Sequence, residues 1–259
     1  VGVCERTRIF RCVNLECRKM TKVFIRTCIR DDYLSRLCYE SFKLTEMKAE
    51  YYFLAEDAQQ SQFGVKEYTF SSSNILPQLV RPCTNNFGGA AGVDGLVGTF
   101  RVARELRLRN DELLIVCDSD IVVFTDVLEE IKNIDFEHLG KGGPYEDEHR
   151  NKDVYCFTHV SGQFNVYTGE YVEKFLNFIE RDNQTNLNIR ALVEEMHSQK
   201  YHVADDTFVS YVGEKYLNVK KHTINPANIW LHDKFYNYTG NEEWETIVET
   251  ILDEDIKSR

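Results

Sequence analysis

A short apolar run in the middle of the chain is interrupted by two carboxylates. The segment ELLIVCDSDIVVF, residues 112–124, is apolar before Asp118 and again after Asp120. Residues 113–117 form a short run rich in branched side chains, which is typical of a strand buried on both faces of a parallel sheet. Residues i and i+2 of an extended chain point to the same side, so we expect Asp118 and Asp120 to present their carboxylates together while Ser119 faces away.

This pair of carboxylates predicts a site for a divalent cation. Two neighbouring carboxylates repel each other, and a hard cation placed between them and an anionic ligand relieves that repulsion. We therefore predict that Asp118 and Asp120 bind Mn²⁺ or Mg²⁺ together with an anionic group such as a diphosphate.

The length of the chain is sufficient for one large domain. With 259 residues, 42% of them hydrophobic, it can bury a full core. We predict a basic N-terminal extension over residues 1–21 and a single domain over residues 22–259 that ends in a helix at 241–257. The net charge of −11 disfavours nucleic acid as the main partner, because phosphate contacts need clustered Lys and Arg.

Apolar segments and cysteines bear on where the chain resides. No apolar segment approaches the roughly 20 residues that a membrane helix needs, so we expect no membrane span in this chain. The eight cysteines are irregularly spaced, and several, such as Cys117, fall in apolar runs where a thiol behaves as a small hydrophobe. Reduced cysteines favour a cytoplasmic protein, and the lumenal catalytic domain of a longer protein is the alternative.

Strand and helix patterns alternate along the chain. Strands are predicted at 22–29, 49–57 and 113–117, helices at 31–44 and, after a glycine-rich start, within 87–108, and a further strand and helix within 160–178. This alternation is typical of an α/β fold with a largely parallel sheet. The charged, glycine-rich stretch 140–153 is either a flap near the site or a solvated loop.

Polar residues follow the ends of the predicted parallel strands. In such sheets ligands bind beyond the carboxyl ends of the strands. The polar residues that we place at this rim are Thr27, Arg30, Glu56, Asp57, Asp118 and Asp120.

Four motifs together resemble a known enzyme family. VFIRTCIRDDYLSRLCYESF and YYFLAEDAQQS resemble the first two strands, and the first helix, of the large inverting, family-2-like glycosyltransferases with the GT-A fold. CDSDIVVF resembles their DxD motif, and ADDTFVSYV is similar to the acidic pair that opens a late helix. The four motifs occur in family order over residues 22–212. The resemblance implies a GT-A, Rossmann-like nucleotide-diphospho-sugar transferase fold.

The resemblance also implies roles for three acids. Asp57 matches the acid that reads the uracil N–H, which implies a UDP-linked donor; as an isolated residue it could also cap a helix. Asp206 matches the catalytic base of an inverting reaction, and Asp205 an acceptor contact or a helix cap. Two capping acids are the alternative.

Further donor and metal contacts are expected late in the chain. In several metal-dependent GT-A enzymes a late histidine completes the cation's ligands and a nearby lysine meets the diphosphate, and His232 with Lys234 is similar to that arrangement. His222 is the competing histidine. Gly162 can let a sugar approach the backbone closely, and Ser119 lies between the two acids that face the donor.

These observations predict a metal-dependent glycosyltransferase, a hexosyl- or pentosyltransferase. It would move a sugar from a nucleoside diphosphate sugar to a glycan or other hydroxyl acceptor with inversion. One alternative is a phosphatase of the haloacid dehalogenase type, in which the first Asp of the DxD motif is a nucleophile. Another is a non-catalytic domain that binds a nucleotide sugar or a glycan, because a fold does not fix a function.

Overall fold

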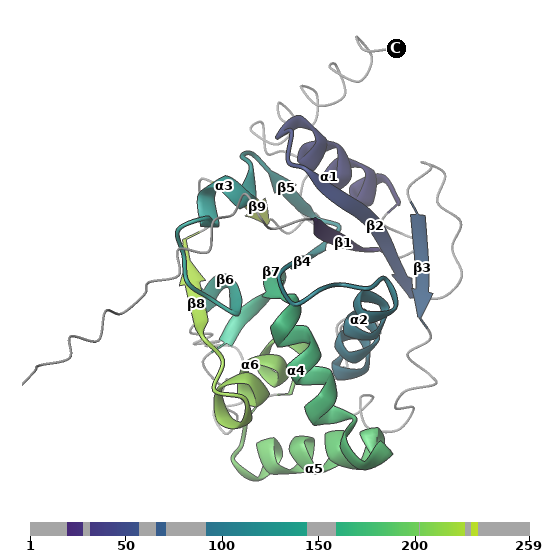
Figure 1. Cartoon of the computed structure of the whole chain (residues 1–259), viewed down its shortest axis with the longest axis vertical. Coiled ribbons are helices and arrows are strands. Elements are labelled where there is room, and N and C mark those ends of the chain that lie inside the picture. The colour runs from purple at the N-terminus through teal and green to yellow at the C-terminus, as the bar shows by residue number, and fades with distance from the viewer. Residues whose placement is uncertain are drawn as a thin grey trace, which may run out of the picture.

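A mixed central sheet organises the protein (Figure 1). The computed structural model describes residues 20–27, 32–56, 66–70, 92–143, 159–201, 203–225 and 229–232. The strands are β1 (Thr21–Thr27), β2 (Ala49–Glu56), β3 (Lys66–Phe70), β4 (Leu113–Asp118), β6 (His138–Gly143), β7 (His159–Thr168) and β8 (Lys221–Ile224). Within the described residues their order is β3-β2-β1-β4-β7-β6-β8.

The sheet is mostly parallel. Strands β3, β2, β1 and β4 run parallel to one another, and β6 runs parallel to β8, whereas β7 runs antiparallel to β4 and β6. A separate small sheet pairs β5 (Ile121–Val123) with β9 (Trp230–His232). The predicted α/β fold with a largely parallel sheet is confirmed.

Helices cover both faces of this sheet (Figure 1). They are α1 (Asp32–Leu44), α2 (Val93–Glu105), α3 (Val127–Ile131), α4 (Gly169–Ile179), α5 (Thr185–Ser198) and α6 (Asp205–Tyr216), with a short 3₁₀ turn at Arg181–Asn183. One apolar core joins the sheet to α2, α4, α5 and α6. The other joins it to α1, α3 and the small sheet. No helix of the described residues is long and apolar enough to cross a membrane.

Strand β4 contributes to both cores. Leu114 and Val116 belong to the core on the α2 side, whereas Leu113, Ile115 and Cys117 belong to the core on the α1 side. All five are buried, which explains the unbroken apolar run in the sequence and confirms the predicted strand.

The strand order reverses beside β1. The chain leaves β1 through α1 to reach β2 on one side, and it reaches β4 on the other side of β1 after α2. Because α1 and α2 cover opposite faces, the carboxyl ends of β1 and β4 flank a topological switch point, the usual ligand site of open α/β sheets. The register pairs Arg26 with Asp118 at this point.

Several predicted boundaries change. Predicted strand 22–29 is observed as Thr21–Thr27, and the helix within 87–108 as Val93–Glu105. Residues 140–143, predicted as part of a loop, form the end of β6, whose register shifts between Gly140 and Gly142. Glycines inside a strand often mark such a bulge, and because glycine is also common in loops, the composition of this stretch predicts a loop. Residues 144–153, 1–19 and the predicted helix 241–257 lie outside the described residues.

Candidate active site at the carboxyl ends of β1 and β4

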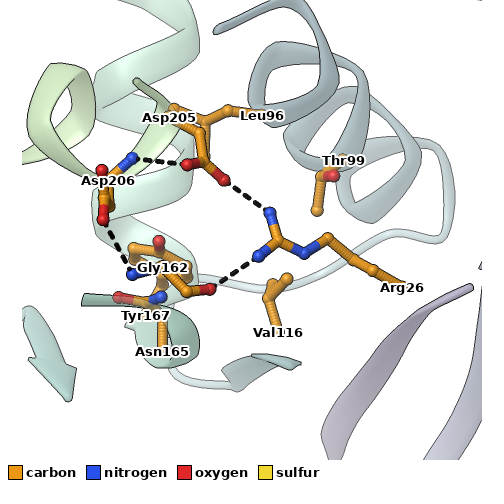
Figure 2. Close-up of a pocket in the computed structure, with 9 residues that line it drawn as sticks. All are labelled: Arg26, Leu96, Thr99, Val116, Gly162, Asn165, Tyr167, Asp205 and Asp206. Atoms are coloured by element: carbon orange, nitrogen blue, oxygen red, sulfur yellow. Dashed lines mark hydrogen bonds and ion pairs between the residues drawn. The ribbon is translucent and has the colours of Figure 1, made fainter. Parts of the chain in front are cut away.

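The guanidinium of Arg26 lies at the centre of the site (Figure 2). Its Nη2 is 2.6 Å from Asp118 Oδ1 and its Nη1 is 2.5 Å from Asp205 Oδ2. Nη2 also donates to the carbonyl oxygen of Gly162 at 2.6 Å. Arg26 alternates with Ile25 along β1, so its side chain shares the sheet face with Phe24 and with α6. The sequence interpretation did not select Arg26.

The ion pairs compensate the buried charge of Arg26. Only 10% of its side chain is exposed. Burial by itself would lower the pKa of Arg26, but the carboxylates of Asp118 and Asp205 raise that pKa above its ordinary value. Removal of one partner of a buried ion pair leaves an uncompensated charge, which lowers the free energy of unfolding by about 3–5 kcal/mol.

The predicted carboxylate pair lies in a turn. Strand β4 ends at Asp118, and Ser119 and Asp120 form a turn before β5. The expectation of an extended chain across Asp118 to Asp120 is therefore wrong. Ser119 is buried, whereas 34% of the Asp118 side chain is exposed.

Both carboxylates still act on the same buried neighbour. Burial raises the pKa of Cys38 well above its ordinary value, the contact with Cys117 raises it next, and the charges of Asp120 and Asp118 raise it further. Cys38 and Cys117 are free thiols whose sulfur atoms lie 3.8 Å apart. The turn therefore keeps both acids near the end of β4, although not by the extended geometry that the spacing predicted.

The acidic pair opens α6, as the sequence predicted. The helix is capped by Ala204 rather than by an acid, and the Ala204 N–H donates to Thr207 Oγ1 at 2.8 Å. Neither acid occupies the N-cap position, but both carboxylates accept from backbone N–H groups of the first turn, so the capping alternative stays open. Asp205 Oδ1 accepts from the Asp206 N–H at 2.9 Å.

Asp206 is held at the start of β7. Its Oδ2 accepts from the Gly162 N–H at 3.1 Å, and its Oδ1 accepts from the Thr207 N–H at 2.7 Å. Because β7 is antiparallel to β4, with Phe164 opposite Cys117, the beginning of β7 lies beside the end of β4. Gly162 is therefore brought to the acids by the sheet itself.

Burial and charge act in opposite directions on Asp205. Burial raises the pKa of Asp205, the Arg26 guanidinium lowers it, and the negative charges of Asp206 and Asp118 raise it, which together give a pKa of about 7. A buried carboxyl group with a raised pKa and specific charged partners is common at functional sites.

A small pocket lies between these groups (Figure 2). It measures 10 Å³, about the space of one water molecule. Its lining residues are Arg26, Leu96, Thr99, Val116, Gly162, Asn165, Tyr167, Asp205 and Asp206. The pocket is too small for a nucleotide sugar.

A buried histidine contacts two residues that line the pocket, Asn165 and Tyr167. His138 Nε2 is 2.8 Å from Asn165 Oδ1, and the imidazole stacks on Tyr167 with ring centroids 4.6 Å apart. Burial lowers the pKa of His138 to about 4, so this imidazole is neutral at pH 7. A neutral Nε2–H that donates to the amide oxygen fits this contact.

The two candidate histidines lie in different sheets. The register places His232 of β9 opposite Ile121, the residue after Asp120. His222 is exposed in β8, the last strand of the central sheet beyond β6. The backbone thus places His232 beside the DxD turn, while the position of its side chain is outside the description.

Other predicted donor contacts are not described in detail. Thr27 ends β1, but its side chain is outside the description, as are Arg30, Asp57 and Lys234. Among the described residues, no group of three or more His, Cys, Asp or Glu side chains gathers as a metal site. The described ligand candidates are the two carboxylates Asp118 and Asp120.

Comparisons with known proteins give similarity of structure alone. No protein-family model and no curated protein matches the sequence. The glycosyltransferase GlyE of Streptococcus pneumoniae is 12% identical with a TM-score of 0.53, over 93% of this chain and 64% of that chain. This likeness shows the fold alone, and it confirms the GT-A-like fold predicted from the sequence.

Two other solved structures have lower TM-scores. The galactosyltransferase LgtC, in complex with donor and acceptor sugar analogues, is 8% identical with a TM-score of 0.47, over 80% of this chain and 74% of that one. Mouse xyloside xylosyltransferase 1 is 11% identical with a TM-score of 0.45, over 80% of this chain and 85% of that chain.

Proposed function

We propose that this protein is a glycosyltransferase that moves a sugar from a nucleoside diphosphate sugar, UDP-linked, to a hydroxyl of a glycan or other acceptor. The observation that carries the proposal is the meeting of Asp118 and the Asp205–Asp206 pair through Arg26 at the switch point of the sheet. Ligands of open α/β sheets bind at that point. The fold shared with a known glycosyltransferase supports the same conclusion.

The donor set suits a hard divalent cation. Mg²⁺ and Mn²⁺ prefer oxygen ligands, and Mg²⁺ in particular is commonly held by one or two carboxylates together with substrate phosphates. Asp118 and Asp120 supply such oxygens, and we propose His232 as a further ligand. A bound cation would act as a Lewis acid that neutralises the departing diphosphate.

Asp206 is the proposed base of an inverting reaction. Its carboxylate stands at the N-terminus of α6, where the Gly162 and Thr207 N–H groups fix its orientation. An ionised carboxylate with fixed orientation can take the proton of an acceptor hydroxyl as that oxygen attacks the sugar.

The remaining donor contacts continue the sequence prediction. We propose that Asp57 accepts from the uracil N–H, that Lys234 meets the diphosphate, and that Thr27, Arg30 and Ser119 complete the nucleotide contacts. We also propose that the sugar approaches the backbone at Gly162. A Cβ there would come within 3.3 Å of Asp205 Oδ1, so the glycine also lets the acids pack closely against β7.

A thermal-shift screen of nucleotide sugars, each with and without Mn²⁺, tests the function. A ligand at 100 times its Kd stabilises the folded state by about 2.7 kcal/mol, which raises Tm by several degrees. We expect a UDP-sugar to do so with Mn²⁺, and mass spectrometry to detect transfer or slow hydrolysis of that donor. Binding without turnover would instead indicate a non-catalytic domain. Hydrolysis of phosphomonoesters without any nucleotide-sugar binding would indicate the phosphatase.

A further inference from the structure

Four residues of the site form a closed ring of hydrogen bonds (Figure 2). Arg26 Nη1 donates to Asp205 Oδ2, and Asp205 Oδ1 accepts from the Asp206 N–H. Asp206 Oδ2 accepts from the Gly162 N–H, and the Gly162 carbonyl oxygen accepts from Arg26 Nη2. The ring joins β1, α6 and β7. Arg26 of β1 and Gly162 of β7 are 136 residues apart in the sequence.

The ring gives its two acids different duties. Both oxygens of each acid accept hydrogen bonds, but Asp205 is 8% exposed, whereas Asp206 is only half-buried. Asp205 is therefore suited to hold the first turn of α6 in place. Asp205 Oδ1 fixes the Asp206 N–H, and the Gly162 N–H within the ring fixes Asp206 Oδ2. The Thr207 N–H, outside the ring, donates to Asp206 Oδ1.

Arg26 is the only cation among the residues of the ring, and its shape matters. A guanidinium presents several N–H donors in a fixed plane, so it can meet a carboxylate on β4, a carboxylate on α6 and a carbonyl on β7 at once. An ammonium group is a compact charge on a flexible stem and cannot hold three separated partners in the same geometry.

We propose that Arg26 is a positioning residue for the transfer reaction. Through Asp205 and Gly162, Arg26 fixes the orientation of the Asp206 carboxylate. The expected effect on kcat rests on the proposed function. The role of Arg26 in the ring can be tested without any turnover. A misplacement of a reacting group by about 1 Å can cost about 10²-fold in rate, so loss of the ring should lower kcat by about that factor.

The test uses Arg26→Gln and Arg26→Lys, with Arg101→Gln as the matched control. Arg101 also forms a part-buried ion pair, with Glu180 at 2.7 Å, but it joins α2 to the end of α4 rather than to the acids. Circular dichroism establishes that each variant is folded. Steady-state kinetics then separates kcat from KM for the donor, and NMR measures hydrogen exchange of the Gly162 and Asp206 amides.

We expect Arg26→Gln to lower kcat by about 10²-fold with a smaller change in KM, and to accelerate exchange at both amides. Arg26→Lys should resemble Arg26→Gln, because charge alone does not rebuild the ring. Arg101→Gln should leave kcat and both amides as in the wild type. A combined Arg26→Gln/Asp205→Asn variant should lose no more kcat than the worse single variant, because both changes open the same ring.

Two results would overturn the inference: wild-type exchange at the Gly162 and Asp206 amides in Arg26→Gln, or full kcat in Arg26→Lys. If Arg26→Gln is unfolded, Asp205→Asn opens the ring from the other side and must show the same accelerated exchange. If the wild type turns over no nucleotide sugar, the proposed function fails, and the amide exchange still decides whether Arg26 fixes Asp206.

Discussion

Arg26 and Asp118 are register partners in the neighbouring parallel strands β1 and β4, and their side chains also meet, with Nη2 2.6 Å from Oδ1. The same guanidinium reaches Asp205, 179 residues further along the chain. A single side chain therefore joins the end of the DxD strand to the helix that carries the acidic pair.

Replacement of either acid of the DxD turn should abolish metal-dependent donor binding. Asp118→Ala and Asp120→Ala each remove a carboxylate ligand, so we expect calorimetry to detect no Mn²⁺-dependent UDP binding in either variant. Asp111→Ala is the control, because Asp111 is exposed and lies before the opposite end of β4. Unchanged Mn²⁺ dependence in both DxD variants would show that the metal assignment is wrong.

Asp206→Asn should preserve donor binding and reduce turnover by roughly 10²–10⁴-fold, because the amide keeps the size of the side chain but lacks basicity. Asp205→Asn should reduce turnover less, because Asp205 positions Asp206 and does not itself take the proton. The anomeric proton of the product, observed by NMR, reports the stereochemistry. From a UDP-α-sugar we expect a β-linked product; an α-linked product would exclude the inverting mechanism.

The two candidate histidines should differ in their effect on metal affinity. His232 is placed by the β5–β9 register next to the DxD turn, whereas His222 is exposed in β8. We expect His232→Ala to weaken Mn²⁺ binding and His222→Ala to leave it unchanged, as measured by titration calorimetry with UDP present. The reverse order would transfer the ligand role to His222.

Buried His138 should make the stability of the protein depend on pH. Burial lowers the pKa of His138 in the folded state from 6.5 to about 4, and the charge of Lys221 lowers it as well, although the Asn165 contact acts in the opposite direction. Below 6.5 the unfolded chain binds a proton that the folded protein does not. The contribution of this group, at most about 3 kcal/mol, is therefore present above pH 6.5 and is lost as the pH falls towards 4.

Urea unfolding at a series of pH values measures this effect as a difference between wild type and His138→Gln. The free energy of unfolding should fall more steeply with acidification in the wild type than in the variant, and other titrating groups cancel in the comparison. His222→Gln, at an exposed position, should keep the wild-type slope. Equal slopes for the wild type and His138→Gln would contradict the assignment.

Local sequence was sufficient for the elements that carry the site. The run before Asp118 is apolar on both faces of the strand, so composition alone indicated β4, and the alternation of strands and helices indicated the α/β class. The acidic pair at the start of α6 was also visible, because acids favour helix N-termini. These signals depend on neighbours within a few positions along the chain.

Only the tertiary structure decided which side chains of those elements contact one another. In the sequence Arg26 is an isolated arginine in a strand, and nothing local predicts partners 92 and 179 residues away. The β1–β4 register and the placement of α6 supply them. Likewise, the turn at Ser119 and Asp120 depends on β5 leaving the central sheet to pair with β9, which the i, i+2 spacing could not indicate. Sequence patterns report burial and local conformation, whereas the partners of a buried charge depend on how distant strands and helices pack.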